Sequence, residues 1–362
     1  MATTTTNYGW TVPTSSDLVK NGATAISTVG SSVDTALWNS GFGQAGKNKI
    51  INGDFYWWQR GTTFNSGFPS YTADRWVLEY SSATGLAVTQ QAFTAGAAPV
   101  AGYEGVYFLR YAVSSAAVTH GIGQRVENVQ TFAGQTVTLS FWAKAVANTT
   151  ITSSIRQNFG SGGSTEVITS GASHSVTTSW QRFNVTIAVP SISGKTIGSG
   201  SYLQVRLLNT TNATFTMDIW GVQVEAGSTA TPFQTATGTI QGELAACQRY
   251  FRSSYSQGVT IPTNSTSAGI VTFSATSVLG NGTFGRVQFS TIMRVAPTIT
   301  TYSYVNSSTG VMSDFSTGAN LSASSAAAYG VGTDGFNIYN ASGGTAAGIY
   351  GFMCHYKADA EL

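Results

Sequence analysis

The stretch NKIINGDFYWWQRG (residues 48–61), followed by YTADRW (residues 71–76), concentrates charge and aromatic rings in one short segment. It places Asp54, Arg60, Asp74 and Arg75 among the rings of Phe55, Tyr56, Trp57, Trp58 and Trp76. Rings carry large apolar area, and arginine both stacks on their faces and forks onto carboxylates. This opening segment therefore predicts either a packed knot at the edge of a β-sandwich or a surface on which sugar rings stack.

Composition indicates a folded β-protein. Among 362 residues, 41 are glycine and only 9% are charged, and runs of Ser, Thr, Asn and Ala suit short strands joined by tight turns. Hydrophobic residues reach 42% and aromatic residues 12%, and disordered chains are poor in both, so the composition excludes a disordered chain. Cys247 and Cys354 lie far apart, which favours two isolated buried thiols over a disulfide.

Charge and hydropathy exclude several partners. The net charge is +2 without any basic run, so we expect no nucleic acid and no anionic membrane surface as a partner. No apolar stretch reaches spanning length and the N-terminal residues do not form a secretion signal, so we expect synthesis in the cytoplasm and no membrane insertion.

Residues 47–235 read as one domain. Five segments alternate between apolar and polar residues with period 2 and are bounded by turn residues: VYFLRYAV (106–113), TVTLSFWAKA (136–145), WQRFNVTIAV (180–189), YLQVRLLN (202–209) and ATFTMDIWGVQVE (213–225). Strands at such spacing, without intervening helices, predict an antiparallel sandwich or jelly roll.

The flanking regions are predicted to be separate elements. In residues 1–46, an extended peptide with the aromatic anchors Tyr8 and Trp10 precedes a short helix whose Val19, Ile26 and Val33 lie seven residues apart. This spacing fits a small parallel bundle, such as a trimer, or equally a helix packed on the next domain. Residues 236–254 predict a helical hinge, and residues 255–362 a distal β-domain, here a second sandwich.

Several motifs resemble known families. The order NGDF, LSFWAKA, WQRFNVTI and FTMDIWGVQVEAG resembles carbohydrate-binding jelly-roll modules. The motifs NYGWTVPTSSDLVKNGATAI and GSTATPFQT followed by ELAACQRYF resemble phage tail fibres and other virion surface proteins. The resemblance implies a homotrimeric tail fibre or tail-tip adhesin, located in the virion on the tail. Its residues 1–46 would join other virion proteins, and its domains would bind a host surface glycan.

Two other functions stay open at this point. One is a structural head-fibre, capsid decoration or collar protein that binds no receptor, and the other is a glycan-degrading tailspike. The three histidines are isolated, and no HExxH, CxxC, GxSxG or Walker-type motif occurs, so we expect no enzyme. The resemblance also implies a structural Ca²⁺ held by Asn52 or Asp54 together with Asp218. The alternative is that Asp54 and Asp74 pair with Arg60 or Arg75 and with turn amides.

Sugar binding needs rings with an exposed face and nearby polar groups. In the first domain the candidates are Trp57, Trp58 and Trp76, and alternation places Trp57 and Trp58 on opposite sides of a strand. In the distal domain the candidate rings lie among Ser, Gly and Asn, a composition typical of adaptable recognition loops. These candidates are Tyr302, Tyr304, Phe315, Tyr329, Phe336 and Tyr339. Ordinary core and turn aromatics are the alternative for both sets.

Overall fold

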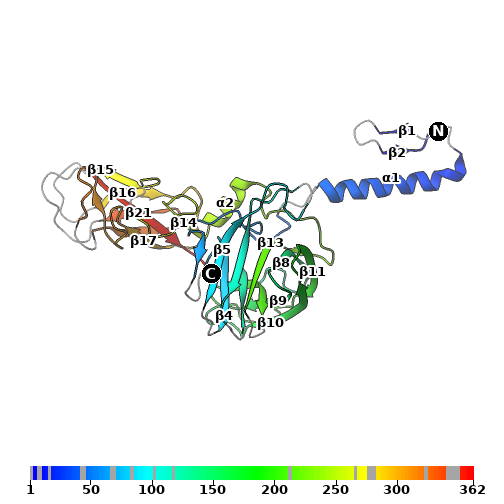
Figure 1. The fold of residues 1–362 in the computed structure, drawn as a ribbon, viewed down its shortest axis with the longest axis horizontal. Coiled ribbons are helices and arrows are strands. Elements are labelled where there is room, and N and C mark those ends of the chain that lie inside the picture. The colour runs from blue at the N-terminus through cyan, green and yellow to red at the C-terminus, as the bar shows by residue number, and fades with distance from the viewer. Residues whose placement is uncertain are drawn as a thin grey trace.

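The computed structural model is built mainly of antiparallel strands, most of which form one two-layered sandwich (Figure 1). The structure describes residues 3–5, 10–14, 18–40, 46–65, 71–81, 85–100, 103–115, 119–210, 214–264, 267–274, 283–321, 325–339 and 351–362. One layer has six strands in the order β11-β8-β13-β6-β5-β3, and the other has five in the order β10-β9-β12-β7-β4. The prediction of an all-β, antiparallel jelly-roll sandwich is confirmed.

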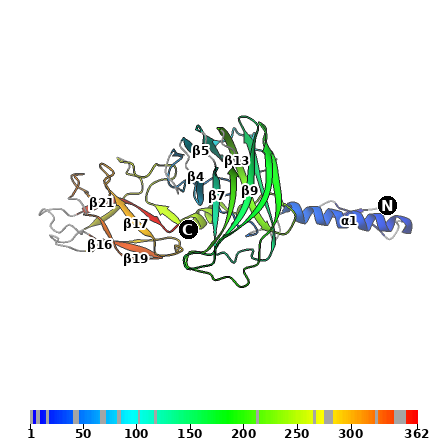
Figure 2. The same ribbon diagram turned by 90° about the horizontal axis from the view of Figure 1, so that it is seen from below.

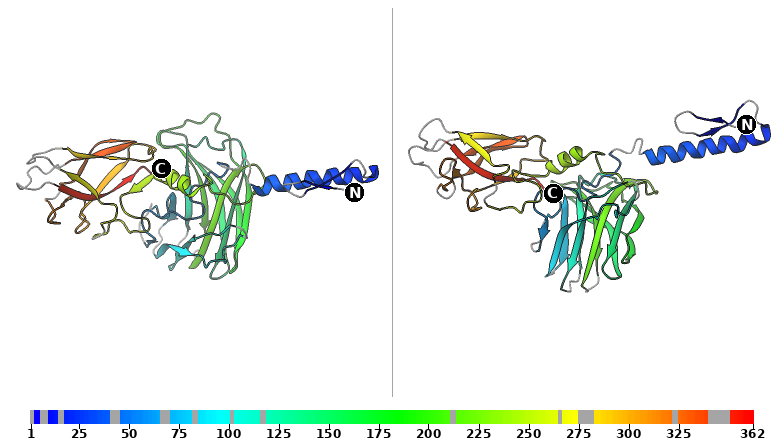
Figure 3. Two further views of the ribbon diagram at one scale, coloured as in Figure 1. Left: turned by 90° about the horizontal axis from the view of Figure 1, so that it is seen from above. Right: turned by 45° about the horizontal axis from the view of Figure 1, so that its top comes forward.

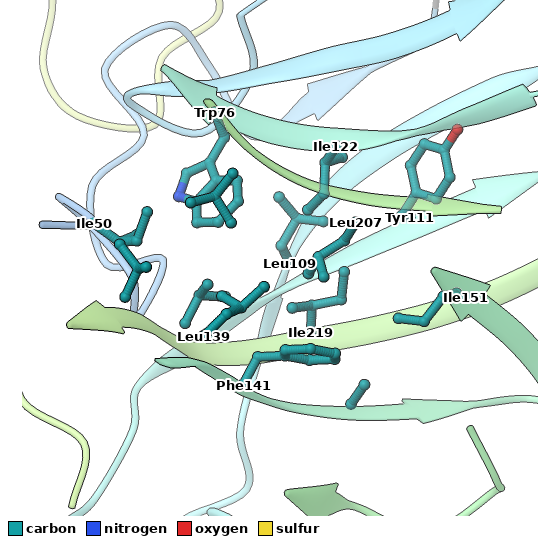
Figure 4. Packing of buried hydrophobic residues seen from close by; sticks show 14 of the residues in the cluster. Ile50, Trp76, Leu109, Tyr111, Ile122, Leu139, Phe141, Ile151, Leu207 and Ile219 are labelled. Carbon is teal, nitrogen blue, oxygen red and sulfur yellow. The ribbon is translucent and has the colours of Figure 1, made fainter. Parts of the chain in front are cut away.

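The bounds of the sandwich strands are β3 (Thr63–Phe64), β4 (Trp76–Ser81), β5 (Leu86–Ala92), β6 (Tyr107–Val113), β7 (Thr119–Glu127), β8 (Thr136–Ala145), β9 (Thr149–Asn158), β10 (Val167–Val176), β11 (Gln181–Ala188), β12 (Tyr202–Asn209) and β13 (Phe215–Ala226). Alternate side chains of these strands fill the space between the layers. In Figure 4, Leu139 and Phe141 of the six-stranded layer face Ile122 and Leu207 of the five-stranded layer. Burying each such side chain stabilises the fold by about 1.5–3 kcal/mol.

The N-terminal part projects from the sandwich (Figure 1). It consists of the helix α1 (Val19–Ser40) and a hairpin of β1 (Thr3–Thr4) and β2 (Thr11–Val12), and α1 contacts β2. Figure 3 shows α1 directed away from the sandwich, so the alternative in which it packs on the following domain is not found among the described residues. Neither described helix is long and apolar enough to cross a membrane.

Beyond the sandwich, α2 (Ile240–Gln248) leads into a second β-region (Figure 2). Its central strand is β21 (Gly351–Asp359), which pairs with β14 (Phe251–Ser253), β15 (Val271–Ser274), β17 (Thr298–Tyr302) and β18 (Ser313–Asp314). A three-stranded sheet, β16 (Thr283–Gln288), β20 (Gly335–Tyr339) and β19 (Ala327–Gly332), shares one hydrophobic core with it. Cys247 and Cys354 are both free and buried, which confirms the prediction of two isolated thiols.

One cluster, here called the arginine joint, connects the opening segment to the end of α2 and to the C-terminal residues; it comprises Arg60, Asp74, Arg75, Tyr250, Phe251 and Glu361. Arg60 and Arg75 both form ion pairs with Glu361. The Arg60 guanidinium lies 3.5 Å from the centroid of the Phe251 ring, and the Arg75 guanidinium lies 3.4 Å from the centroid of the Tyr250 ring. The Asp74 carboxylate lies 3.6 Å from Arg60 Nη1, as the ion-pair alternative predicted. Through the rings of Tyr250 and Phe251, the end of the predicted helical hinge therefore packs on two arginines of the opening segment.

Candidate functional site

A tight turn decides which rings of the opening segment are buried. Asn52 has a φ of +56°, a left-handed conformation that Asn tolerates. Its side-chain oxygen accepts from Trp57 N at 2.9 Å, and its amide donates to the carbonyls of Trp57 and Asp74. Gly53 lies so close to β13 that a Cβ there would sit 2.2 Å from the Val222 carbonyl oxygen. Only glycine therefore fits between this turn and the sheet.

The turn separates the three tryptophan candidates. Trp58 and Trp76 are fully buried, with indole N–H groups that donate to the carbonyls of Phe55 at 2.6 Å and Asn52 at 3.0 Å. The prediction that these two rings stack on sugars is wrong, because both faces are covered by the core. Trp57 is half-buried at the rim of the sandwich, so one ring of the pair is buried and the other partly exposed, but neither lies on a strand and the predicted alternation across a strand is not found.

A cavity of about 190 Å³, here called the rim pocket, opens beside Trp57. Its walls come from the opening turn, the β5–β6 connection and the segment that enters α2: Asp54, Tyr56, Trp57, Tyr103, Phe233, Gln234, Thr235, Gly238, Thr239, Ile240 and Glu243. Sequence reasoning missed Tyr103 and Glu243 because both are distant from the opening segment along the chain. The one signal for Glu243 was its place in the first turn of a predicted helix, which the helix dipole already explains.

Asp54 is the unusual group of the rim pocket. Its Oδ2 lies 3.4 Å from the Tyr103 hydroxyl, and its buried Oδ1 has no hydrogen-bond partner within the described part of the chain. Burial, followed by the charge of Glu243, raises the pKa of Asp54 from 3.8 to about 6. The pairing of Asp54 with Arg60 or Arg75, proposed as one alternative, is not found, because both arginines lie in the arginine joint.

Glu243 has a structural role as well as its charge. Its carboxylate accepts from the backbone N–H of Asn52 at 2.8 Å and of Thr237 at 2.7 Å, and from the Thr237 hydroxyl at 3.0 Å. These bonds join the opening turn to the start of α2, where the Thr239 side chain accepts from Gly242 N. The second carboxylate of the pocket is thus held in place, whereas the buried Oδ1 of Asp54 has no hydrogen-bond partner among the described groups.

The residues proposed for Ca²⁺ do not form one site. Asp218 makes two hydrogen bonds with Arg110, at 2.7 and 2.9 Å. Gly53, beside Asp54, accepts at its carbonyl from Val222 N, four residues along β13 from Asp218, or roughly 13 Å at the rise of a strand. The Asn52 side chain is occupied by the turn. Among the described residues no group of three or more His, Cys, Asp or Glu could hold a metal ion.

The six distal candidates divide by burial. Tyr302 and Phe336 are buried, at 4% and 0% exposure, so the prediction that they contact a ligand is wrong. Phe315 and Tyr329 are more than 60% exposed, and Tyr304 and Tyr339 are half-buried. The rings of Tyr329 and Tyr339, on neighbouring strands of the three-stranded sheet, lie 6.4 Å apart. This pair is the part of the distal prediction that the structure places together.

The N-terminal candidates are only partly described. Tyr8 and the side chain of Val19 lie outside the described residues, whereas Trp10 is half-buried beside α1. Ile26 is 67% exposed and Val33 is half-buried. The exposed β-branched side chain on a helix that projects into solvent is compatible with self-association, which stays a prediction.

No family model and no curated protein matches the chain. Among solved structures, the sandwich is similar to the enzymatically active domain of tailspike protein 4 of bacteriophage CBA120, with 16% identity and a TM-score of 0.33 over 50% of this chain and 22% of that one. It is also similar to the CBM22-1 xylan-binding domain of Xyn10C from Paenibacillus barcinonensis, with 16% identity and a TM-score of 0.33 over 51% of this chain and 98% of that one. The N-terminal cellulose-binding domain of Cellulomonas fimi β-1,4-glucanase C matches with 16% identity and a TM-score of 0.30 over 48% and 98%. At these values none of them assigns a function to this chain.

Proposed function

We propose that the chain is a non-enzymatic virion surface protein of the tail-fibre class that binds a host glycan. The observation that carries the glycan part is the rim pocket, where partly exposed rings lie beside a carboxylate whose buried Oδ1 has no hydrogen-bond partner among the described residues. Rings that stack on a sugar, combined with a few polar groups that read its hydroxyls, are the usual chemistry of glycan recognition.

The layout of the molecule supports the attachment part of this proposal. Figure 2 shows α1 and the distal strands on opposite sides of the sandwich, so that one end can join a particle while the other faces outward. A helix of 22 residues with two glycines gains little stability by itself, and association of three copies would supply it. A trimer would also combine three weak sites into one strong attachment.

A glycan array probed with the full chain tests the proposal. We expect retention of a subset of bacterial surface glycans, lost in Trp57→Ala and kept in the matched control Phe183→Ala, which removes a half-buried ring of β11 that packs on Phe141 and His174, outside the lining of the pocket. Tyr329→Ala measures what the distal tyrosine pair adds. A chain that is monomeric in light scattering and retains no glycan would contradict the proposal.

A structural head-fibre, capsid decoration or collar protein is distinguished by its position. A map of the particle with residues 1–46 at a capsid vertex, together with a silent array, would favour that role. Residues 1–46 at the baseplate, together with a positive array, would favour the adhesin.

Glycan hydrolysis is the second candidate function, and the raised pKa of Asp54 beside Glu243 favours it. A protonated carboxyl group near neutral pH can act as a general acid, and a second carboxylate is then needed as base or nucleophile. Both oxygens of Glu243 already accept hydrogen bonds, which argues against that second role. Release of reducing ends from host polysaccharide, abolished in Asp54→Asn, would establish hydrolysis.

A further inference from the structure

We infer that the rim pocket binds an organic ammonium group, carried by an amino sugar or by a choline-type headgroup. This inference rests on the proposed function, since it names the kind of ligand that the same pocket takes. It is carried by three features of the pocket that point to the same chemistry: its rings, its charge and its size.

The rings form the walls that a cation prefers. Tyr56 and Trp57 meet edge to face with their centroids 5.0 Å apart, and Tyr103 lines the same cavity with its hydroxyl 3.4 Å from Asp54 Oδ2. The face of an aromatic ring attracts a cation through its quadrupole, and tryptophan does so most strongly. Several rings around one small cavity are the arrangement that recognises alkylammonium groups.

The charge of the pocket is negative. Asp54 and Glu243 both line it, and neither Lys nor Arg occurs among its described lining residues. The N-terminus of α2 brings a partial positive charge, which Glu243 in the first helical turn offsets. Asp54 keeps a buried Oδ1 without a partner among the described groups, and no described ion pair offsets its charge; an ammonium group in the pocket would offset that charge electrostatically.

The size of the pocket limits the ligand. A cavity of 190 Å³ holds roughly six waters, which is smaller than the usual site for a drug-sized molecule. One headgroup or one sugar ring fits, whereas a longer glycan would have to extend beyond the rim. The polar residues Gln234 and Thr235 of the wall can then read the hydroxyl groups of an amino sugar.

The test uses the full chain and four probes: glucosamine, N-acetylglucosamine, glucose and choline. Binding is followed by calorimetry and by the chemical shifts of the tryptophan indoles. We expect glucosamine or choline to bind at least tenfold more tightly than glucose and N-acetylglucosamine. Whichever cation binds more tightly identifies the source, since glucosamine carries the sugar and choline the quaternary headgroup.

The matched variants are Asp54→Asn and Asp334→Asn, which remove a pocket carboxylate and an exposed distal one. Asp54→Asn should lower the affinity for the more tightly bound cation at least tenfold, and Asp334→Asn should leave that affinity unchanged. Choline keeps its charge at every pH, so its affinity should fall as Asp54 takes up a proton below about pH 6, approaching tenfold per pH unit. Glu243 and Tyr103 are the other titratable groups that face Asp54.

The inference would be overturned if neither glucosamine nor choline bound more tightly than N-acetylglucosamine, or if the affinity for the tighter cation were unchanged in Asp54→Asn. These results are separable from failure of the proposed function. Retention of neutral glycans by both the wild type and Asp54→Asn would keep the glycan-binding proposal and remove this one. Binding of choline alone, with a silent glycan array, would support the ammonium pocket and remove the glycan.

Discussion

The opening segment carries two carboxylates with opposite surroundings. Asp74, in the arginine joint, accepts from Gln59 N at 3.1 Å and from its side-chain amide at 2.7 Å, and it pairs with Arg60. Asp54, in the rim pocket, has no cation in any described ion pair; its Oδ2 makes a long contact with the Tyr103 hydroxyl, and backbone N–H groups of Tyr56 and of Asp54 itself also lower its pKa. Both clusters combine acids with aromatic rings, yet only the rim pocket has no Lys or Arg among its described lining residues.

The position of the cations distinguishes the structural role of one cluster from the candidate binding role of the other. In the arginine joint the guanidinium groups fill the space between rings and carboxylates, so the cluster joins two parts of the fold. In the rim pocket no described arginine or lysine lines the wall, and the space is a cavity. The presence of Trp, Tyr and Asp alone does not distinguish the two cases, whereas the position of the cations does.

Arg75→Ala should break the arginine joint and have the largest effect. Arg75 is 1% exposed, pairs with Glu361, and stacks on Tyr250. Its removal leaves a buried carboxylate that has lost one of its two cations, and such losses cost about 3–5 kcal/mol. Urea unfolding measures the change. The matched control Arg286→Ala, which removes an exposed ion pair with Asp334, should change the midpoint little. Equal effects of the two variants would contradict the structural role of the joint.

Trp58→Ala and Trp57→Ala should separate stability from binding. Because Trp58 is fully buried, Trp58→Ala should lower the free energy of unfolding by about 3–5 kcal/mol. The half-buried Trp57 should cost much less and instead reduce ligand binding in the pocket. Urea midpoints and glycan retention, measured on both variants, give the comparison. Loss of binding in both without a difference in stability would be inconsistent with the burial of Trp58.

The pH dependence of stability should reveal Asp54. Its pKa is about 6 in the folded protein against 3.8 as a reference, so the folded state holds this proton more tightly. The wild type should therefore lose stability relative to Asp54→Asn as the pH rises from about 4 to about 6. Above about pH 6 the difference in free energy of unfolding between the two proteins should stay constant. Urea unfolding at a series of pH values tests this. Parallel curves for the two proteins would show that Asp54 is not perturbed.

Tyr103→Phe should give the smallest effect. It keeps the ring and removes the hydroxyl whose 3.4 Å contact lowers the pKa of Asp54. The pKa of Asp54 should rise slightly, by NMR titration of its carboxyl carbon, and cation binding at neutral pH should weaken a little. A fall in that pKa would mean that the hydroxyl does not donate to the carboxylate.

Some residues of the site could be predicted and others could not. Trp57 and Asp54 were found because they lie in one short segment of unusual composition. Tyr103 and Glu243 could not be found, since an isolated tyrosine in a loop and an acid at a helix start are ordinary features. The distal set shows the same limit, because Phe336 and Tyr329 have similar surroundings in sequence but are 0% and 64% exposed.

By itself the sequence determined the class of fold, because alternation of apolar residues dictates which side of each strand is buried. The order of its motifs also predicted that the opening segment begins the sandwich, whereas the close fit of Gly53 against β13 is a finding of the structure. Only the tertiary structure brings Arg60 and Arg75 to Glu361 and leaves Asp54 without a cation in the described ion pairs. The reason is physical: a charge is compensated by whichever opposite charge lies nearest in space, and nearness in space is set by packing of segments that are distant along the chain.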